Sequence, residues 1–333
     1  MYTPLKLKVM YDTLVLHLNK EDMKGYKYEN VLRNITQTCE YKGRVAGGCG
    51  YWENLRITAT EKKVVCRGSI VKFQRGSNAP FLYLEDVKKL IKYIGNCLGI
   101  PLEKADVDIV DIAENFEMEN PPQLYIQRMQ TLASYSSNNW EDTKYFSSRG
   151  AVLRFYDKTQ ELRQKNQHRP ERARCSLPGR NLLRYEVRFK RGKIRQMFGR
   201  GLKASDLYDK EVFWRFVSEW FYCYESINKL PDTVLNVTFD QIRKQEDLLN
   251  WCVCALNAHV PVSEFVKQAF KNRVNPQEGD RQYHKRLQDR IREALVLYND
   301  YMTGSDLTLE LTRKIEDFLT KKFESSPDAY DKN

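Results

Sequence analysis

Two stretches of the sequence decide the fold: Leu153-Arg154-Phe155-Tyr156-Asp157-Lys158-Thr159-Gln160-Glu161 and Leu183-Arg184-Tyr185-Glu186-Val187-Arg188-Phe189-Lys190. Apolar and polar residues alternate in both, which is the two-residue period of a half-buried strand. In the second stretch the polar face collects Arg184, Glu186, Arg188 and Lys190. In the first stretch Arg154, Tyr156 and Lys158 share the polar face. We therefore predict two strands that each pair an apolar face with a strongly cationic one.

The net charge of +11 is concentrated around these two strands. Between Arg149 and Lys203 there are 17 Lys and Arg against 4 Asp and Glu, a local charge of +13. The remaining residues carry 38 basic and 40 acidic groups, so they sum to −2. A basic region can be only a solvated face. Its concentration here, with aromatic residues interleaved, favours a polyanionic partner, and nucleic acid is the commonest one.

Composition excludes several other classes of protein. A chain of 333 residues with 41% hydrophobic and 30% charged residues fits a soluble globular protein of one large domain or two ordinary ones. No apolar run approaches the roughly 18 residues of a membrane-spanning helix, and the N-terminus lacks the long apolar stretch of a signal peptide. We therefore expect a cytoplasmic protein. The eight cysteines are irregularly spaced, so neither a disulfide framework nor a zinc site is expected.

Hydrophobic periodicity predicts an α+β fold for the first part of the chain. Its expected strands are Thr13–Leu18, Asn54–Ala59, Lys63–Phe73, Asp106–Glu117, Thr143–Phe146 and Gly150–Lys158. Helices are expected at Leu84–Leu98 and from Asn120 to about Ser134. The polar, basic stretch from Gln164 to Asn181 is expected to be a mobile loop. These elements should form a curved, mostly antiparallel sheet with packed helices.

The second part of the chain is expected to be mainly helical. Aromatic and aliphatic stripes at helical spacing run through 205–228 and through two further helices separated by Gly304 and Ser305. We predict a catalytic domain at 1–204 and a helical C-terminal domain at 205–333, with a disordered tail from about residue 325.

The charged strand faces carry residue types that phosphodiester chemistry needs. A tyrosine hydroxyl can attack phosphorus and form a covalent phosphotyrosine, which preserves the bond energy for religation. Arg154 and Lys158 flank Tyr156, and Glu186 could hold a divalent metal from the neighbouring strand. A third predicted strand supplies further oxygen ligands and carries Asp111. Carboxylate ligands favour Mg²⁺ or Mn²⁺.

Each of these residues also has a purely structural interpretation. Tyr156 is one of 20 tyrosines, Glu186 could belong to an ion-pair ladder with Arg184 and Arg188, and Asp111 could cap a turn. Their combination on three predicted strands, inside the one basic region of the sequence, favours the catalytic interpretation.

Several short motifs occur in a familiar order. They are Tyr11-Asp12-Thr13-Leu14-Val15-Leu16, Gly68-Ser69-Ile70-Val71-Lys72-Phe73 with Gly76-Ser77-Asn78, Val110-Asp111-Ile112-Ala113, Asn139-Trp140-Glu141, Phe155-Tyr156-Asp157-Lys158 and Leu183-Arg184-Tyr185-Glu186. The chain resembles the filamentous-phage gene II/X family of rolling-circle replication initiators. It is also similar to plasmid initiators of the Rep_trans type. The resemblance covers about residues 9 to 200.

The resemblance implies a site-specific endonuclease that nicks one DNA strand at a double-stranded origin. Such an enzyme stays joined to the 5′ phosphate, leaves a 3′ hydroxyl to prime synthesis, and religates the displaced strand at the end. By position, Tyr156 is the nucleophile, Lys158 neutralises the phosphate, and Asp111 and Glu186 hold Mg²⁺ or Mn²⁺. We expect the DNA-binding residues to be Lys72, Asn78, Arg154, Arg184, Arg188 and Lys190.

The resemblance also implies partners and a location. Origin DNA and its single strand are the expected substrates, with host helicase and polymerase as partners, in the cytoplasm of a bacterial host and with no membrane contact. A homodimer is a further candidate. Initiators with a His-hydrophobe-His motif chelate metal through paired histidines, but the four histidines of this chain form no such pair, so carboxylates would take over.

Two other functions compete with the nicking enzyme. One is a non-catalytic origin DNA-binding protein whose basic strands only hold phosphates. The other is a tyrosine recombinase, which is disfavoured because the usual Arg, His-x-x-Arg and C-terminal Tyr arrangement is missing. Separately, the cations of the C-terminal helices suggest origin recognition or dimer contact: Arg281, Lys285, Arg286, Arg290 and Arg292.

Overall fold

The computed structural model describes residues 7–40, 46–77, 82–140, 142–168, 180–229, 243–257, 262–273, 277–299 and 307–324. The chain divides into two compact units. Unit 1 comprises Met1–Gln127, Thr131–Ile227 and Arg313–Asn333, and unit 2 comprises Arg128–Gln130 and Asn228–Thr312. The predicted domain boundary after residue 204 stays a prediction, and the tail from about 325 lies outside the described residues.

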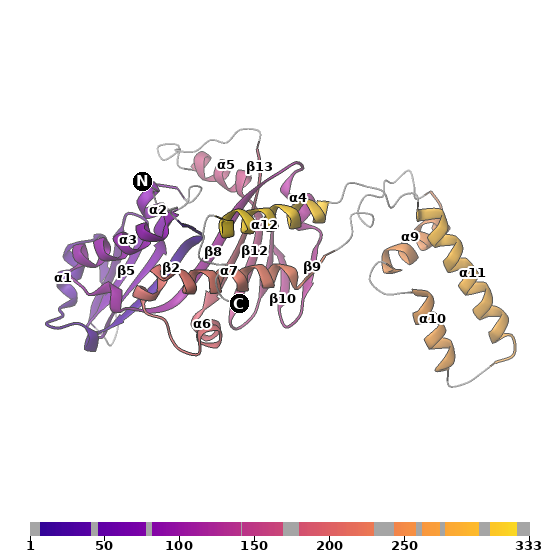
Figure 1. Cartoon of the computed structure of the whole chain (residues 1–333), viewed down its shortest axis with the longest axis horizontal. Coiled ribbons are helices and arrows are strands. Elements are labelled where there is room, and N and C mark those ends of the chain that lie inside the picture. The colour runs from indigo at the N-terminus through magenta and orange to yellow at the C-terminus, as the bar shows by residue number, and fades with distance from the viewer. Residues whose placement is uncertain are drawn as a thin grey trace. The chain divides into compact units, whose positions relative to one another are not determined.

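A ten-stranded sheet forms the centre of unit 1 (Figure 1), and each neighbouring pair of its described strands is antiparallel. The α+β fold class with a mostly antiparallel sheet is therefore confirmed. In spatial order the strands are β10 (Ser136–Trp140), β11 (Thr143–Ser147), β12 (Ala151–Asp157), β13 (Asn181–Lys190), β8 (Asp106–Met118), β2 (Tyr11–Asn19), β6 (Lys63–Ser69), β5 (Leu55–Thr60), β4 (Gly47–Trp52) and β3 (Thr36–Glu40).

Shorter elements complete the list for unit 1 and its borders. Two small sheets pair β1 (Lys8–Val9) with β7 (Leu82–Tyr83), which are antiparallel, and β14 (Ile227–Lys229) with β9 (Met129–Leu132). The helices are α1 (Tyr28–Arg33), α2 (Ile70–Arg75), α3 (Leu84–Leu98), α4 (Pro122–Ile126), α5 (Lys158–His168), α6 (Arg191–Phe198), α7 (Lys210–Glu225) and α12 (Leu307–Glu324), with the 3-10 turns η1 (Lys20–Asp22), η2 (Leu102–Lys104) and η4 (Ala204–Tyr208).

The two alternating stretches form the strands β12 and β13, which lie next to each other. Three predicted ends were wrong. The strand predicted from Lys63 to Phe73 stops at Ser69, because the Ser69 hydroxyl caps α2 by accepting the Lys72 amide at 3.1 Å. The strand predicted to end at Lys158 stops at Asp157, and α5 occupies the start of the predicted loop. The helix predicted from Asn120 to Ser134 is only the short α4, followed by β9.

Helix α7 covers the apolar face of the sheet and forms the core of unit 1. Figure 1 shows α7 running across the strands. The ring of Tyr185 stacks on Phe155 at 4.4 Å between centroids and meets Trp220 of α7 at 4.6 Å. The Tyr185 hydroxyl donates to the Trp220 carbonyl at 3.0 Å. Phe318 of α12 meets Phe116 of β8 edge-on at 6.0 Å. Because this apolar packing fixes one face of β12, β13 and β8, their opposite face is left for the charged residues.

Unit 2 is helical, as the sequence pattern predicted for the C-terminal region. It contains α9 (Gln245–Asn257), α10 (Val262–Lys271) and α11 (Asp280–Asn299). The Ser263 hydroxyl of α10 donates to the Gln288 amide oxygen of α11 at 2.6 Å, and Cys254 of α9 donates to the Ala294 carbonyl at 3.4 Å. Across both units, none of the described helices has the length and apolarity that a bilayer crossing requires.

Candidate active site

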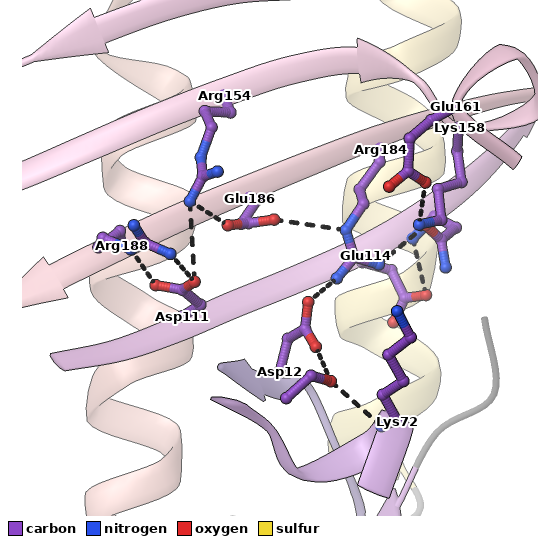
Figure 2. Close-up of polar contacts among 12 residues, drawn as sticks. Asp12, Lys72, Asp111, Glu114, Arg154, Lys158, Glu161, Arg184, Glu186 and Arg188 are labelled. Atoms are coloured by element: carbon purple, nitrogen blue, oxygen red, sulfur yellow. Dashed lines mark hydrogen bonds and ion pairs between the residues drawn. The ribbon is translucent and has the colours of Figure 1, made fainter. Parts of the chain in front are cut away.

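Strand register brings the predicted site residues onto one face of the sheet, which we call the polar face. It comprises Asp12, Asp111, Asn115, Arg154, Tyr156, Arg184, Glu186 and Arg188. Tyr156 of β12 lies opposite Arg184 of β13, and Arg154 lies opposite Glu186. On the other side of β13, Arg188 lies opposite Asp111 of β8 and Arg184 lies opposite Asn115. Figure 2 shows the resulting alternation of guanidinium and carboxylate groups across the strands.

Asp111 is the most deeply buried acid of the polar face, with 0% of its surface exposed. Arg188 holds it with two hydrogen bonds, Nε to Oδ1 at 2.7 Å and Nη2 to Oδ2 at 2.6 Å (Figure 2). Arg154 adds a longer ion pair to Oδ2 at 3.7 Å. The hydrogen bond to Asp111 raises the pKa of Arg188, so the guanidinium stays charged. This bidentate geometry is the strongest form of the Arg–carboxylate contact.

Glu186 is shared between two guanidinium groups. Its Oε1 lies 2.6 Å from Arg154 Nη2, and its Oε2 lies 3.5 Å from Arg184 Nε. Burial raises the pKa of Glu186 to about 7, and the nearby charge of Asp111 adds to this rise, while Arg154 and Arg184 oppose it. Near neutral pH this carboxyl can therefore exchange a proton, which is a property that acid–base catalysis uses.

Arg184 is buried in the centre of the polar face. Its Nη2 lies 2.5 Å from Oδ2 of Asp12, and its Nη1 donates to the Asn115 side-chain oxygen at 3.0 Å. Burial alone would lower the pKa of Arg184, but the negative charge of Asp12, supported by Glu186, holds it above its ordinary value. The sequence motifs included Asp12, yet no role was predicted for it. The signal that could have found it is an acid placed directly before the buried strand 13–18.

Tyr156 is half-buried on the polar face, beside Arg184. Among the residues that the structure describes, none is hydrogen-bonded to the Tyr156 hydroxyl. Burial raises the pKa of Tyr156, and the charges of Glu186, Glu161 and Asp12 raise it further, whereas the charge of Arg184 lowers it. At neutral pH the side chain is therefore a protonated phenol, and it becomes a nucleophile only if its proton is removed and its charge is compensated.

Lys158 is the first residue of α5 and is fully buried. Its Nζ lies 2.6 Å from Oε2 of Glu161, one helical turn along. The same ammonium group lies 5.9 Å from the centroid of the Tyr156 ring. Lys158 is thus close to Tyr156, as its predicted role requires, but it reaches that position from a helix and not from the strand face.

The remaining predicted DNA contacts are spread around the polar face. Lys190 is half-buried at the end of β13, where its Nζ donates to the Ser148 carbonyl at 3.2 Å. Lys72 is exposed on α2, and Figure 2 shows its side chain pointing toward Glu114. Asn78 lies outside the described residues. The structure therefore brings Arg154, Arg184 and Arg188 together and leaves the two lysines at the border.

The oxygen donors of the polar face match a divalent metal in chemistry. Mg²⁺ commonly binds one or two carboxylates together with waters and substrate phosphate oxygens, and Asp111 and Glu186 are close enough for one charge to raise the pKa of the other. In this structure Arg154, Arg184 and Arg188 hold their oxygens. The described residues include no group of three or more His, Cys, Asp or Glu arranged to hold a metal.

The five cations that the sequence singled out on α11 divide into those with an ion pair and those without one among the described residues. Arg290 is paired with Glu246 and Arg292 with Asp289, at 2.9 Å for the second pair. Arg281, Lys285 and Arg286 are exposed at the start of α11 and have no ion pair with another described residue. The exposed ring of Tyr283 lies on the same segment.

Comparison with known protein families gives a match over more than half of the chain. The family model Phage_CRI, which describes the N-terminal region of a replication-associated protein, matches residues 10–221. The matched range contains every residue of the polar face and most of helix α7, which packs behind it. A comparison with curated proteins found no significant match.

Proposed function

Because the chain belongs to the Phage_CRI family of replication-associated proteins, we propose that it nicks and rejoins one strand of origin DNA through Tyr156. The family indicates a replication-associated initiator, and a replication initiator binds DNA. The finer proposal concerns the chemistry, the residues and the metal. Partnership with host helicase and polymerase, a homodimer and a cytoplasmic location in a bacterial host belong to the same proposal.

The proposed reaction is a transesterification. The Tyr156 hydroxyl oxygen attacks phosphorus, one P–O bond forms to the tyrosine, and the bond from phosphorus to the 3′ oxygen breaks. The phenol gives up its proton, and the departing 3′ oxygen takes one. One phosphodiester is thus exchanged for another, and the reverse attack by a 3′ hydroxyl rejoins the strand and frees the tyrosine.

One observation carries the proposal: Tyr156 lies opposite the buried Arg184 and on the same face of the sheet as Glu186. Arg184 can compensate the negative charge on a phenolate or on the phosphate, because such fixed cations stabilise the charge that develops in the transition state. Lys158, at 5.9 Å from the Tyr156 ring, adds a second positive charge.

We also propose that cleavage depends on Mg²⁺ or Mn²⁺, with Asp111 and Glu186 as the residues that would hold the ion. A bound divalent ion would supply Lewis-acid stabilisation of the scissile phosphate. The oxygen-only donor set supports this proposal. The residues of the chain itself bind and orient the DNA strand and carry the nucleophile.

DNA binding is proposed for two regions. Around the polar face, Arg154, Arg188, Lys190 and Lys72 would contact phosphates, supported by the local charge of +13 between Arg149 and Lys203. In unit 2 the exposed Arg281, Lys285 and Arg286 of α11 would contact the origin duplex. An exposed tyrosine among them suits a surface that meets nucleic acid.

Nicking of supercoiled origin DNA tests the proposal. The wild type with Mg²⁺ or Mn²⁺ should convert supercoiled circles into open circles and form a covalent protein–DNA adduct, and chelator should stop both. Tyr156→Phe should bind the DNA but neither nick it nor form the adduct. If Tyr156→Phe nicks as well as the wild type, the nucleophile is a different residue. If no metal supports cleavage while origin binding persists, the protein is a non-catalytic origin-binding protein.

A further inference from the structure

We propose that Asp12 is a positioning residue that fixes the guanidinium of Arg184 beside Tyr156 and joins this site to helix α2. The inference rests on the proposed function, because it concerns the same tyrosine. Asp12 comes from β2, 172 residues before Arg184 in the sequence, so it links two distant parts of the chain. It is itself buried, with only 6% of its surface exposed.

The contacts of Arg184 show what Asp12 contributes. Polar groups lie near each nitrogen of the guanidinium: Asp12 at 2.5 Å from Nη2, Asn115 at 3.0 Å from Nη1, and Glu186 at 3.5 Å from Nε. Asp12 makes the shortest of these contacts and supplies a full charge. A guanidinium fork held at both ends keeps a fixed orientation, because its donors are planar and rigid.

The other oxygen of Asp12 connects the site to α2. The Ser69 hydroxyl donates its single proton to Asp12 Oδ1, and the same hydroxyl oxygen accepts the Lys72 amide at 3.1 Å. Ser69 is also the residue that caps the start of α2. A continuous chain of hydrogen bonds therefore runs from the start of α2, which carries Lys72, through Ser69 and Asp12 to Arg184 (Figure 2).

The contact of Asp12 with Arg184 does more than neutralise the charge of the guanidinium. Arg184 has two carboxylate partners: Glu186 at 3.5 Å, which Arg154 contacts more closely, and a second acid, Asp12, at 2.5 Å. The second acid lies on the side of Arg184 that faces β2, opposite to the β12 side where Tyr156 lies in register. Asp12 thus holds the guanidinium from the β2 side. The positive charge of Arg184 remains available to Tyr156 and to a phosphate. Small displacements of such a group are costly for catalysis, at roughly 100-fold for a 1 Å misplacement.

The test separates the rate of the chemical step from DNA affinity. Asp12→Asn keeps the size of the side chain and an oxygen for Ser69 but removes the charge. We expect the single-turnover rate of adduct formation on an origin oligonucleotide with Mn²⁺ to fall about 10- to 100-fold. The Kd for the same oligonucleotide should change by less than about threefold, because outer phosphate contacts remain. Asp206→Asn is the matched control. It breaks the ion pair between Asp206 of η4 and the exposed Arg200, and it should change neither the single-turnover rate nor the Kd.

A double-mutant comparison tests the route through Arg184. Arg184→Lys keeps the charge but loses the fork, and adding Asp12→Asn to it should cause little further loss of rate. Should Asp12→Asn fail to fold, Ser69→Ala replaces it. This variant leaves the Asp12–Arg184 ion pair and removes the link to α2 together with the cap of that helix, and a several-fold fall in rate is expected. A rate equal to the wild type, or losses that multiply in the double variant, would overturn this inference alone. Absence of a Tyr156-dependent adduct in the wild type would overturn the proposed function with it.

Discussion

At the scale of single residues, the polar face is a set of buried acids that arginines hold in place. Asp111 has no exposed surface, and its bidentate partner Arg188 is what makes its burial tolerable. Removing one partner of such a pair leaves an uncompensated charge, which is strongly destabilising. The arginines of this face therefore have two tasks, since they stabilise the fold and are the proposed contacts for phosphate.

We predict that Arg188→Ala lowers the free energy of unfolding by about 3–5 kcal/mol, because it leaves the buried carboxylate of Asp111 without its bidentate partner. Arg188→Lys should cost less, since a charge remains but the bidentate geometry is lost. Chemical denaturation measures both. Arg191→Ala is the control, because Arg191 pairs with Asp106 at a more exposed position and should cost no more than about 1 kcal/mol. Equal losses for Arg188 and Arg191 would contradict the prediction.

The raised pKa of Glu186 predicts a pH dependence of stability. Burial raises the folded-state pKa to about 7 from the ordinary value of 4.5, so the folded state binds the proton more tightly than the unfolded state. The resulting stabilisation is complete below pH 4.5 and is lost as the pH rises through 7. We expect the wild type to lose on the order of 1–3 kcal/mol from this group between about pH 4.5 and 8. Glu186→Gln, which cannot titrate, should show a smaller loss over this range in denaturation curves; an identical pH profile would contradict it.

How far the site could be predicted from the sequence depends on the range of each contact. Alternation within β12 and β13 was enough to put Arg154, Tyr156, Arg184 and Glu186 on polar faces, because the two-residue period is local. The contact of Asp12 with Arg184 needs β2, β8 and β13 in the right register, and a single sequence holds no signal for that. An ion-pair ladder was the structural interpretation given for Glu186, whereas for Asp111 it was a turn cap; the structure pairs Asp111 with Arg188.

At the scale of elements, α7 packs against the apolar faces of the strands, so their charged faces lie together on the other side of the sheet as a single site. Its rings pack behind β12 and β13, with Trp220 meeting Tyr185 at 4.6 Å. The strands were predictable because their pattern is strict, but their ends were not. Ile70 and Lys158 look like strand residues in the sequence, yet α2 begins at Ile70 and α5 at Lys158, since capping and helix-start geometry decide where a strand ends.

Trp220→Ala should therefore lower the free energy of unfolding by about 3–5 kcal/mol, as large cavities in a well-packed core do. Trp220 has 0% of its surface exposed, whereas Trp140 of β10 has 67% exposed and provides the same substitution without a cavity. Trp140→Ala should change stability by no more than about 0.5 kcal/mol. Thermal or chemical unfolding of both variants decides the matter: comparable effects would mean that α7 is not the core of unit 1.

At the scale of the whole molecule, exposed cations lie in both units, although the net excess of positive charge lies between Arg149 and Lys203. The segment from Arg149 to Lys203 holds the largest excess, and the start of α11 in unit 2 adds exposed cations without ion pairs among the described residues. Helicity and charge of the C-terminal region were readable from the sequence. Which of its cations are paired was not, because the pairing of Arg290 with Glu246 joins two helices.

We predict that replacing Arg281, Lys285 and Arg286 with Ala weakens binding to origin duplex. If each contacts one phosphate, the slope of log K against log salt should become less steep by roughly 0.9 per residue removed. Replacing Arg290 and Arg292, which are already paired, should have a smaller effect and serves as the control. Equal salt slopes for the wild type and the triple variant would exclude α11 as a DNA contact.

The most direct test of the central claim is to find the residue that carries DNA after cleavage. The covalent complex formed on an origin oligonucleotide would be digested with nuclease and protease, and the nucleotide-bearing peptide would be sequenced by mass spectrometry. We predict a 5′-phosphotyrosyl nucleotide on Tyr156 and on no other of the 20 tyrosines. A nucleotide on a different residue, or strand cleavage with no covalent peptide at all, would contradict the claim that Tyr156 is the nucleophile.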